Sequence, residues 1–526
     1  MAEDNNDSRG LLLLKKGQKG LVHALFSRLG LFVLMLLLQA ALLVVMFQAL
    51  ERFLPLIYGG TTLFVVIMVI YLLNTDIDPT AKITWLVFIM LFHVLGAMLF
   101  WFTQSEVGHR ALKFRIEELI RMSKDTLGQD QAAYDSLQKE NPGAASLINY
   151  INRNGCHPVY DDTQVTYFPN GQSKWEELLR QLEKAEKYVF LEYFIIDEGL
   201  MWGKVLELLA RKAKEGVDVR VLYDGTNEFT TLPHSYQKQL RDLGIQCKVF
   251  SPVAPIVSTH YNYRDHRKIF IIDGKVAFNG GINLADEYIG RVKRFGEWKD
   301  TAVMLTGNAV RSFTLMFLQM WCFDDKHAEF QTFLEPVRPW TESAEGFVAP
   351  FGDCPLDADK VGERVYMDIL NRAQKYVHIM TPYLILDSET ETALKFAAER
   401  GVEVSLILPG IPDKKIPYAL AKTHYASLLA SGVKIYEYEP GFVHAKVFVS
   451  DDREAVVGTI NLDYRSLYHH FECATWMYGV DCVAQIEQDF QDTCKACRQV
   501  TAKTIWKGYR WWKPIGNMMK VLAPLL

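Results

Sequence analysis

The larger, C-terminal part of this chain contains one sequence pattern twice. Lys184–Tyr193 reappears in outline as Arg372–Thr381, and Gly216–Leu222 reappears as Gly401–Ile407. A motif of the form His-x-Lys-x4-Asp, followed by Gly-x-x-Asn, comes next in both copies. The landmarks recur in the same order at a nearly constant offset, which indicates two homologous halves. The fold must therefore accommodate a duplicated unit.

Each half alternates between two kinds of segment. Short runs rich in β-branched and aromatic residues, such as Tyr188–Ile196, Val217–Tyr223 and Ile269–Ile272, are separated by longer segments with helical periodicity, such as Gly203–Glu215. This alternation predicts an α/β unit with a largely buried sheet. We therefore expect two α-β-α sandwich halves that pack face to face around a pseudo-two-fold axis.

The two motifs supply matching sets of polar residues. The first set is His266, Lys268, Asp273 and Asn283, and the second set is His444, Lys446, Asp451 and Asn461. Side chains two residues apart on a strand share a face, so each histidine projects together with its lysine. A hairpin after each strand returns the asparagine toward the histidine. The glycines beside the asparagines permit close approach of the backbone to a ligand.

These residue types suit the exchange of a phosphodiester without a metal ion. One neutral imidazole attacks phosphorus, a second imidazolium protonates the departing alcohol, and cations hold the non-bridging oxygens. Each half supplies one histidine and one lysine, so the site is complete only when the halves meet. The two histidines must begin the reaction in opposite protonation states.

Other polar residues near the motifs have more than one interpretation. Asp273 and Asp451 begin turns, so fixing the hairpin explains them as well as direct catalysis does. Glu192 follows a buried strand and is better explained as a structural carboxylate than as a site residue. His469 and His470 are predicted to be loop or surface residues rather than ligands.

Three apolar runs precede the repeats, at Leu29–Ala49, Phe53–Leu73 and Ile83–Phe102. Each run is about as long as a helix that crosses a bilayer core. Basic residues lie before the first run and after the third, and such flanks prefer the cytoplasm. We therefore predict a multi-pass protein of the cell membrane with two true crossings, one re-entrant or interfacial run, and a cytoplasmic catalytic part.

Composition narrows the set of partners. The formal net charge of −5 argues against a protein that wraps nucleic acid. Cys494 and Cys497 are the only close cysteine pair, and no second pair completes a zinc site, so we predict no metal. From Lys503 onward the chain has five basic residues, three tryptophans and no acidic residue. This tail predicts contact with the headgroups of an anionic bilayer, and a helix docked on the catalytic part is the alternative.

Several stretches resemble a known family. They are Tyr263–Lys268, Gly280–Tyr288, Trp298–Asp300, Phe442–Lys446, Gly458–Ser466 and Glu472. With these stretches the sequence resembles the phospholipase D superfamily and, within it, the bacterial cardiolipin synthases. The similarity runs from about residue 75 to the C-terminus. The run Leu29–Ala49 goes beyond the two-span pattern of those enzymes.

The resemblance implies a phospholipase D-like fold and transfer of a phosphatidyl group from one phosphatidylglycerol to another, which gives cardiolipin and glycerol without a metal or organic cofactor. His266 is then the nucleophile, and His444 protonates the leaving glycerol and deprotonates the incoming hydroxyl. The remaining implied roles are phosphate binding by Lys268, Lys446, Asn283 and Asn461, histidine orientation by Asp300 and Glu472, and completion of the catalytic motifs by Asp273 and Asp451.

The predicted organisation has five parts. They are a membrane segment (1–103), a juxtamembrane connector (104–155), a first phospholipase D-like half (156–340), a second half (341–500) and a membrane-surface tail (501–526). Two alternatives use the same site: a hydrolase, with water as acceptor, and a phosphatidyltransferase with another alcohol. A degenerate membrane scaffold ranks last, because both motifs are intact.

Overall fold

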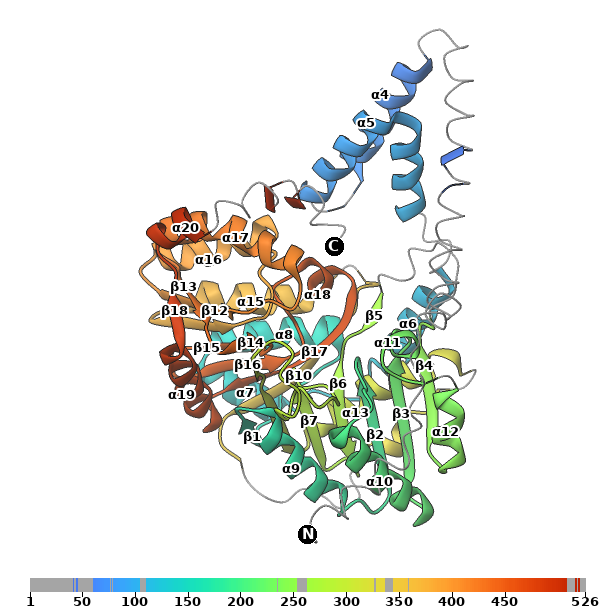
Figure 1. Ribbon diagram of the computed structural model, residues 1–526. Helices are drawn as coiled ribbons and strands as arrows, with labels where there is room; N and C mark the ends of the chain where they lie inside the picture. The colour runs from blue at the N-terminus through green and yellow to red at the C-terminus, as the bar shows by residue number, and fades with distance from the viewer. Residues whose placement is uncertain are drawn as a thin grey trace.

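Figure 1 shows the fold of the chain as a computed structural model. The structure describes residues 60–104, 110–252, 263–335 and 344–508, apart from 76, 78, 234, 326–327 and 358, together with the isolated positions 41, 44–45, 516–517 and 519–520. Most of Leu29–Ala49 and the beginning of Phe53–Leu73 lie outside the described residues.

The first half forms a mixed sheet in the order β1-β9-β7-β6-β2-β3-β4. Its strands are β1 (Thr163–Phe168), β2 (Tyr188–Tyr193), β3 (Asp218–Asp224), β4 (Gln246–Phe250), β6 (Lys268–Ile272), β7 (Val276–Gly280) and β9 (Ala302–Gly307). β2, β3 and β4 run parallel, and β6, β7, β9 and β1 add antiparallel neighbours. All of β2 is buried, as its nearly unbroken apolar sequence predicts for a strand covered on both faces.

The second half forms a sheet in the order β10-β17-β16-β15-β11-β12-β13-β18. Its strands are β10 (Phe347–Asp353), β11 (Tyr376–Met380), β12 (Glu403–Pro409), β13 (Lys434–Tyr438), β15 (Val447–Ser450), β16 (Glu454–Gly458), β17 (His470–Tyr478) and β18 (Cys497–Gln499). From β10 to β13 this order repeats that of the first sheet strand for strand. The duplication predicted from the sequence is therefore confirmed.

The helices follow the same repetition. The first half contains α9 (Gly171–Leu182), α10 (Leu200–Lys214), α11 (Asn227–Thr230), α12 (Tyr236–Asp242), α13 (Val310–Trp321), a short 3-10 turn (Cys322–Asp324) and α14 (Gln331–Leu334). The second half contains α15 (Val361–Arg372), α16 (Ser388–Glu399), α17 (Lys415–Ala430), α18 (Tyr464–Tyr468) and α19 (Cys482–Lys495). Helices cover the outer face of each sheet and build one apolar core on each side of the molecule.

A third core lies between the sheets and joins the two halves. It includes Phe313 and Phe317 of α13, Phe490 of α19, Ile271 of the first sheet and Val449 of the second. Every residue of α13 except Arg311 is buried, as expected for a helix with neighbours on all sides. Each sheet therefore has helices on both faces, and the halves share a single interior.

Two short strand pairs cross between the halves. β5 (Arg264–Asp265) leaves the first half and pairs in parallel with the beginning of β17. β8 (Glu297–Lys299), also from the first half, pairs in parallel with β14 (Gly441–Val443) of the second. The residue after β5 is His266, and the residue after β14 is His444. These pairs therefore fix both motif histidines at the boundary between the halves.

Two apolar helices precede the catalytic body and extend away from it in Figure 1. α4 spans Gly60–Asn74, and α5 spans Pro79–Gln104 with non-helical backbone at His93 (φ 38°, ψ −104°). They pack through a small cluster around Leu72, Trp85 and Phe100. Among the described residues, no helix combines the length and the apolarity that a membrane crossing requires.

The predicted connector is helical and packs onto the body. It contains α6 (Arg110–Ser123), α7 (Gln131–Glu140) and α8 (Pro142–Gly155). Asp130 caps α7, and Asn141 caps α8 through its side-chain oxygen. Leu137 of α7 and Ile148 of α8 belong to the core on the outer face of the second sheet. This segment is thus part of the folded body as well as a link to it.

The described part of the C-terminal tail also docks on the protein. α20 (Ala502–Gly508) lies against α17, and Ile505 packs on the core of the second half. Met519 contacts a small cluster formed by Ile385, Leu420 and Tyr464. For these residues the docked-helix alternative holds, whereas most of the aromatic and basic stretch lies outside the described residues.

Candidate active site

The histidine of the first motif is held by a carboxylate of the second half. The backbone N–H of His266 donates to the carbonyl oxygen of Phe471 (3.0 Å), which extends the β5–β17 pairing by one residue. This places Nδ1 of His266 2.9 Å from both carboxylate oxygens of Glu472. Glu472 is fully buried and also accepts a hydrogen bond from the hydroxyl of Thr459.

The histidine of the second motif is held by a carboxylate of the first half. The backbone N–H of His444 donates to the carbonyl oxygen of Lys299 (2.7 Å), which extends the β8–β14 pairing. Nδ1 of His444 lies 2.6 Å from Oδ2 of Asp300. Asp300 is buried, and a Cβ on Gly281 would lie 2.1 Å from its Oδ1. Position 281 therefore requires a glycine because the carboxylate of Asp300 lies against it, and not because a ligand does.

Both motif lysines are buried beside the histidines. Nζ of Lys268 donates to the carbonyl oxygen of His266 (2.6 Å), and Nζ of Lys446 lies 2.9 Å from Nδ1 of His444. The charge of Lys268 lowers the pKa of both histidines, because it lies close to both of them. The structure therefore brings two histidines and two lysines to one place.

Burial controls the protonation of this group. It lowers the pKa of His266 and of His444 well below the usual histidine value, and the neighbouring lysines lower both further. Burial also raises the pKa of Asp300 to about 7 and lowers that of Lys446 to about 7. Near neutral pH, Asp300 therefore titrates within hydrogen-bonding distance of Nδ1 of His444.

The motif aspartates lie away from the histidines. Asp273 and Asp451 follow the far ends of β6 and β15, and each starts a turn with positive φ (54° and 55°). Asp273 accepts hydrogen bonds from three consecutive backbone N–H groups, at residues 186–188 (2.8–2.9 Å), and Asp451 does the same at residues 374–376 (2.7–2.9 Å). These contacts support the hairpin-fixing interpretation. The catalytic role of these two aspartates stays a prediction.

The two asparagines differ in their surroundings. Oδ1 of Asn283 accepts from the backbone N–H of Ile195 (3.1 Å), and its Nδ2 donates to the hydroxyl of Tyr288 (2.6 Å). Asn461 is buried, and its Oδ1 has no hydrogen-bond partner within the described residues. Asn283 is thus engaged by the protein itself, whereas Asn461 keeps an open acceptor.

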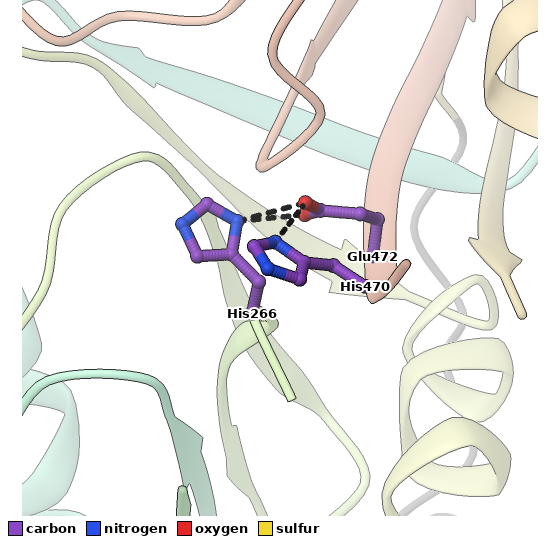
Figure 2. A group of neighbouring side chains, drawn as sticks. All are labelled: His266, His470 and Glu472. Atoms are coloured by element: carbon purple, nitrogen blue, oxygen red, sulfur yellow. Dashed lines mark hydrogen bonds and ion pairs between the residues drawn. The ribbon is translucent and has the colours of Figure 1, made fainter. Parts of the chain in front are cut away.

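A third histidine belongs to the site. Figure 2 shows His470 beside His266, with dashed lines from both rings to the carboxylate of Glu472. His470 is buried, its ring centroid lies 5.2 Å from that of His266, and its Nδ1 lies 3.6 Å from Oε1 of Glu472. The prediction that His470 is a loop or surface residue is wrong. The sequence could have placed His470 beside Glu472, because residues 470 and 472 lie two apart on one strand and share a face.

The ligating atoms of His266, His470 and Glu472 all lie within 4.8 Å of one another. Two imidazoles and one carboxylate form a ligand set that zinc accepts. This is the group, among the described residues, that could hold a metal ion.

Aromatic residues that the motif did not reveal surround both histidines. Phe194 meets the ring of His266 edge-on at 4.8 Å, and its position directly after β2 gave no specific signal. The rings of Trp298 and Tyr288 lie 5.5 and 5.6 Å from that of His444. Glu192 is fully buried, and its carboxylate lies 3.8 Å from the guanidinium of Arg267, the residue after His266.

Comparisons with known proteins agree with this arrangement. A family model described as "Cardiolipin synthase, PLD-like domain" matches residues 178–321 and 366–494. The chain is 57% identical to an uncharacterized protein of Streptococcus mutans (87% of this chain and 99% of that one). It is 32% identical to a cardiolipin synthase of Alkalihalophilus pseudofirmus (88% of this chain and 93% of that one).

Among solved structures, a phosphatidylserine synthase of Haemophilus influenzae matches 72% of this chain and 97% of its own length, with a TM-score of 0.56 and 14% identity. This structural likeness shows the fold. The family model and the relatives show the family. The chain belongs to the cardiolipin synthase family of phospholipase D-like proteins.

Proposed function

We propose that this protein is a cardiolipin synthase. It transfers the phosphatidyl group of one phosphatidylglycerol to the glycerol headgroup of a second, and it releases glycerol. One observation carries the proposal: each motif histidine is bound through Nδ1 by a carboxylate of the opposite half. This arrangement leaves Nε2 of both rings available for the two sides of one phosphate.

The hydrogen bonds support different roles for the two histidines. Nδ1 of His266 faces both oxygens of Glu472, so it carries the proton and Nε2 keeps its lone pair. Nδ1 of His444 faces the ammonium of Lys446 and the carboxyl of Asp300, whose pKa of about 7 retains a proton near neutral pH. These contacts support His266 as the nucleophile and the Asp300–His444 pair as the acid.

The steps then balance. Nε2 of His266 attacks phosphorus and forms a phosphatidyl-histidine, and the bond to the glycerol oxygen breaks. That oxygen takes a proton from Nε2 of His444, and glycerol leaves. The hydroxyl of the second phosphatidylglycerol returns a proton to His444 as it attacks phosphorus and releases His266. Lys268 and Lys446, which are both buried, stabilise the charge on the non-bridging oxygens.

The proposal includes a cell-membrane location with the catalytic body on the cytoplasmic side and an anionic bilayer as the partner surface. The three apolar runs and their basic flanks support it. So does the apolar surface of α4 and α5, where Leu63, Met90 and Leu91 are each more than half exposed. Membranes that retain the full-length protein after a high-salt wash support the location, and release of the protein by salt contradicts it.

The test of the activity uses the purified full-length protein and phosphatidylglycerol as the only lipid. We expect cardiolipin and free glycerol to form in equal amounts, as measured by lipid chromatography and a glycerol assay. Glycerol with phosphatidic acid but without cardiolipin would show a hydrolase instead. Another primary alcohol, added as a competing acceptor, tests the second alternative. His266→Ala and His444→Ala are the controls for contaminating activity.

A further inference from the structure

A groove lies beside His444 and outside the group of residues assigned above. Its volume is about 580 Å³, and it is bordered by the beginning of α17 and by α18. Lys414, Lys415 and Arg465 contribute three cations to its lining, and all three side chains are exposed. The groove therefore carries exposed positive charge and is open to solvent.

Apolar side chains also line the groove. Ile385 and Ile416 line it together with Tyr464, and Ile416 is 43% exposed. Met519 of the C-terminal segment packs on Ile385 and Tyr464. A site that joins several cations to exposed apolar side chains matches a phospholipid, which has an anionic phosphate beside hydrocarbon.

The groove is connected to the catalytic residues through aromatic side chains. The ring of Tyr383 in its lining lies 6.4 Å from that of Phe442, and the ring of Phe442 lies 5.9 Å from that of His444. Lys414 lies above the Tyr383 ring (5.6 Å) and is close enough to lower the pKa of His444. The groove is therefore near His444, which handles the proton of the alcohol in the proposed reaction.

One acidic residue, Asp463, also lines the groove. It is buried, and its Oδ1 accepts from the backbone N–H of Ser466 (2.8 Å) at the beginning of α18. Its carboxylate is therefore directed into a helix cap, whereas the three cations lie at the surface. The exposed charge of the groove remains positive.

We propose that this groove binds the acceptor phosphatidylglycerol, with its phosphate at Lys414, Lys415 and Arg465 and its terminal hydroxyl directed to His444. The inference rests on the proposed function and adds where the second lipid binds. The glycerol of the acceptor spans from the groove to the reacting phosphorus. Free glycerol or water needs no such site, because neither carries a phosphate.

The experiment compares two reactions that share every step except acceptor binding. Cardiolipin formation requires a second phosphatidylglycerol. Exchange of labelled glycerol into phosphatidylglycerol requires only the donor lipid, the two histidines and free glycerol. The variants are Lys415→Glu and Arg465→Glu, and Lys495→Glu on the exposed face of α19 is the charge-matched control.

We expect Lys415→Glu and Arg465→Glu to lower the ratio of cardiolipin formation to glycerol exchange by about tenfold each, as loss of one charged contact predicts. Lys495→Glu should keep the ratio of the unmodified protein. An unchanged ratio in both groove variants overturns the inference. A parallel loss of both reactions, together with weaker sedimentation with phosphatidylglycerol vesicles, would show a general membrane-contact patch and would also overturn it.

The proposed function is judged separately, on the unmodified protein. If that protein makes no cardiolipin, the function fails before the groove is tested. If it makes cardiolipin and the ratio does not respond to the variants, only the groove assignment fails.

Discussion

Nδ1 of His266 lies 2.9 Å from both oxygens of Glu472, although the two residues belong to different halves of the chain. His444 and Asp300 form the reciprocal pair at 2.6 Å. Each half therefore supplies a reacting imidazole to the site and a carboxylate to the imidazole of the other half. Each motif histidine is therefore oriented by a residue that its own half does not contain.

Replacement of the orienting carboxylate tests this relationship. Glu472→Gln removes the charge that holds the proton on Nδ1 of His266, so the ring can adopt the tautomer that blocks Nε2. By analogy with buried carboxylate–imidazole pairs in other enzymes, we expect kcat to fall by about 10³-fold. Thermal unfolding of the variant should stay cooperative, because the amide preserves the shape of the side chain. A variant that keeps half of its kcat would contradict the assignment.

The two histidines should act as one unit. His266→Ala and His444→Ala should each lower kcat by about 10⁴-fold or more, and the double variant should be little worse than either one. The decisive measurement is acid-quench trapping of labelled lipid on the protein, followed by peptide mapping. We expect the label on His266. Label on His444 would reverse the two roles.

The pH dependence follows from the Asp300–His444 pair. Burial raises the pKa of Asp300 to about 7, so the pair loses its acidic proton as the pH rises through that value, and kcat should fall toward alkaline pH. The pKa of His266 lies well below the usual histidine value, so the nucleophile stays neutral on the acidic side of the optimum. Asp300→Asn should remove this alkaline limb and lower kcat. A rate that rises from pH 7 to pH 9 would be inconsistent with the assignment.

The motif aspartates should affect stability rather than chemistry. Asp273→Ala leaves three backbone N–H groups without their acceptor, and we expect a loss of about 3 kcal/mol in the free energy of unfolding. Asp273→Asn should lose less, because the amide oxygen still accepts and asparagine tolerates positive φ. Denaturant unfolding gives the first quantity, and kcat of the folded fraction should stay within about twofold, since a small rate effect accompanies any distant change. A stable variant without activity would restore the catalytic interpretation.

The cluster in Figure 2 predicts sensitivity to zinc. Zinc bound by His266, His470 and Glu472 would hold the nucleophile in an inactive arrangement, so Zn²⁺ should inhibit and a chelator should restore activity. His470→Phe keeps an aromatic ring beside Phe194 and removes one ligand, and it should require about tenfold more Zn²⁺ for the same inhibition. Mg²⁺, which prefers oxygen ligands, serves as the control. Equal Zn²⁺ inhibition of both proteins would place the metal elsewhere.

The sequence by itself determined the duplicated α/β fold, the two His-x-Lys pairs and the family. These features depend on local patterns: apolar runs that must be buried, side chains two apart on a strand, and landmarks repeated in order. The strand order of the second sheet repeats that of the first because both copies of the pattern encode the same unit.

Only the tertiary structure decided which of the remaining residues lie beside the reacting histidines and which stabilise the backbone elsewhere. Asp273 and His266 belong to one motif, but β6 lies between them, and a strand carries its two ends far apart. His470 comes beside His266 only because β5 pairs with β17 across the halves. Contacts of this kind join residues about 200 positions apart, and no local pattern contains them.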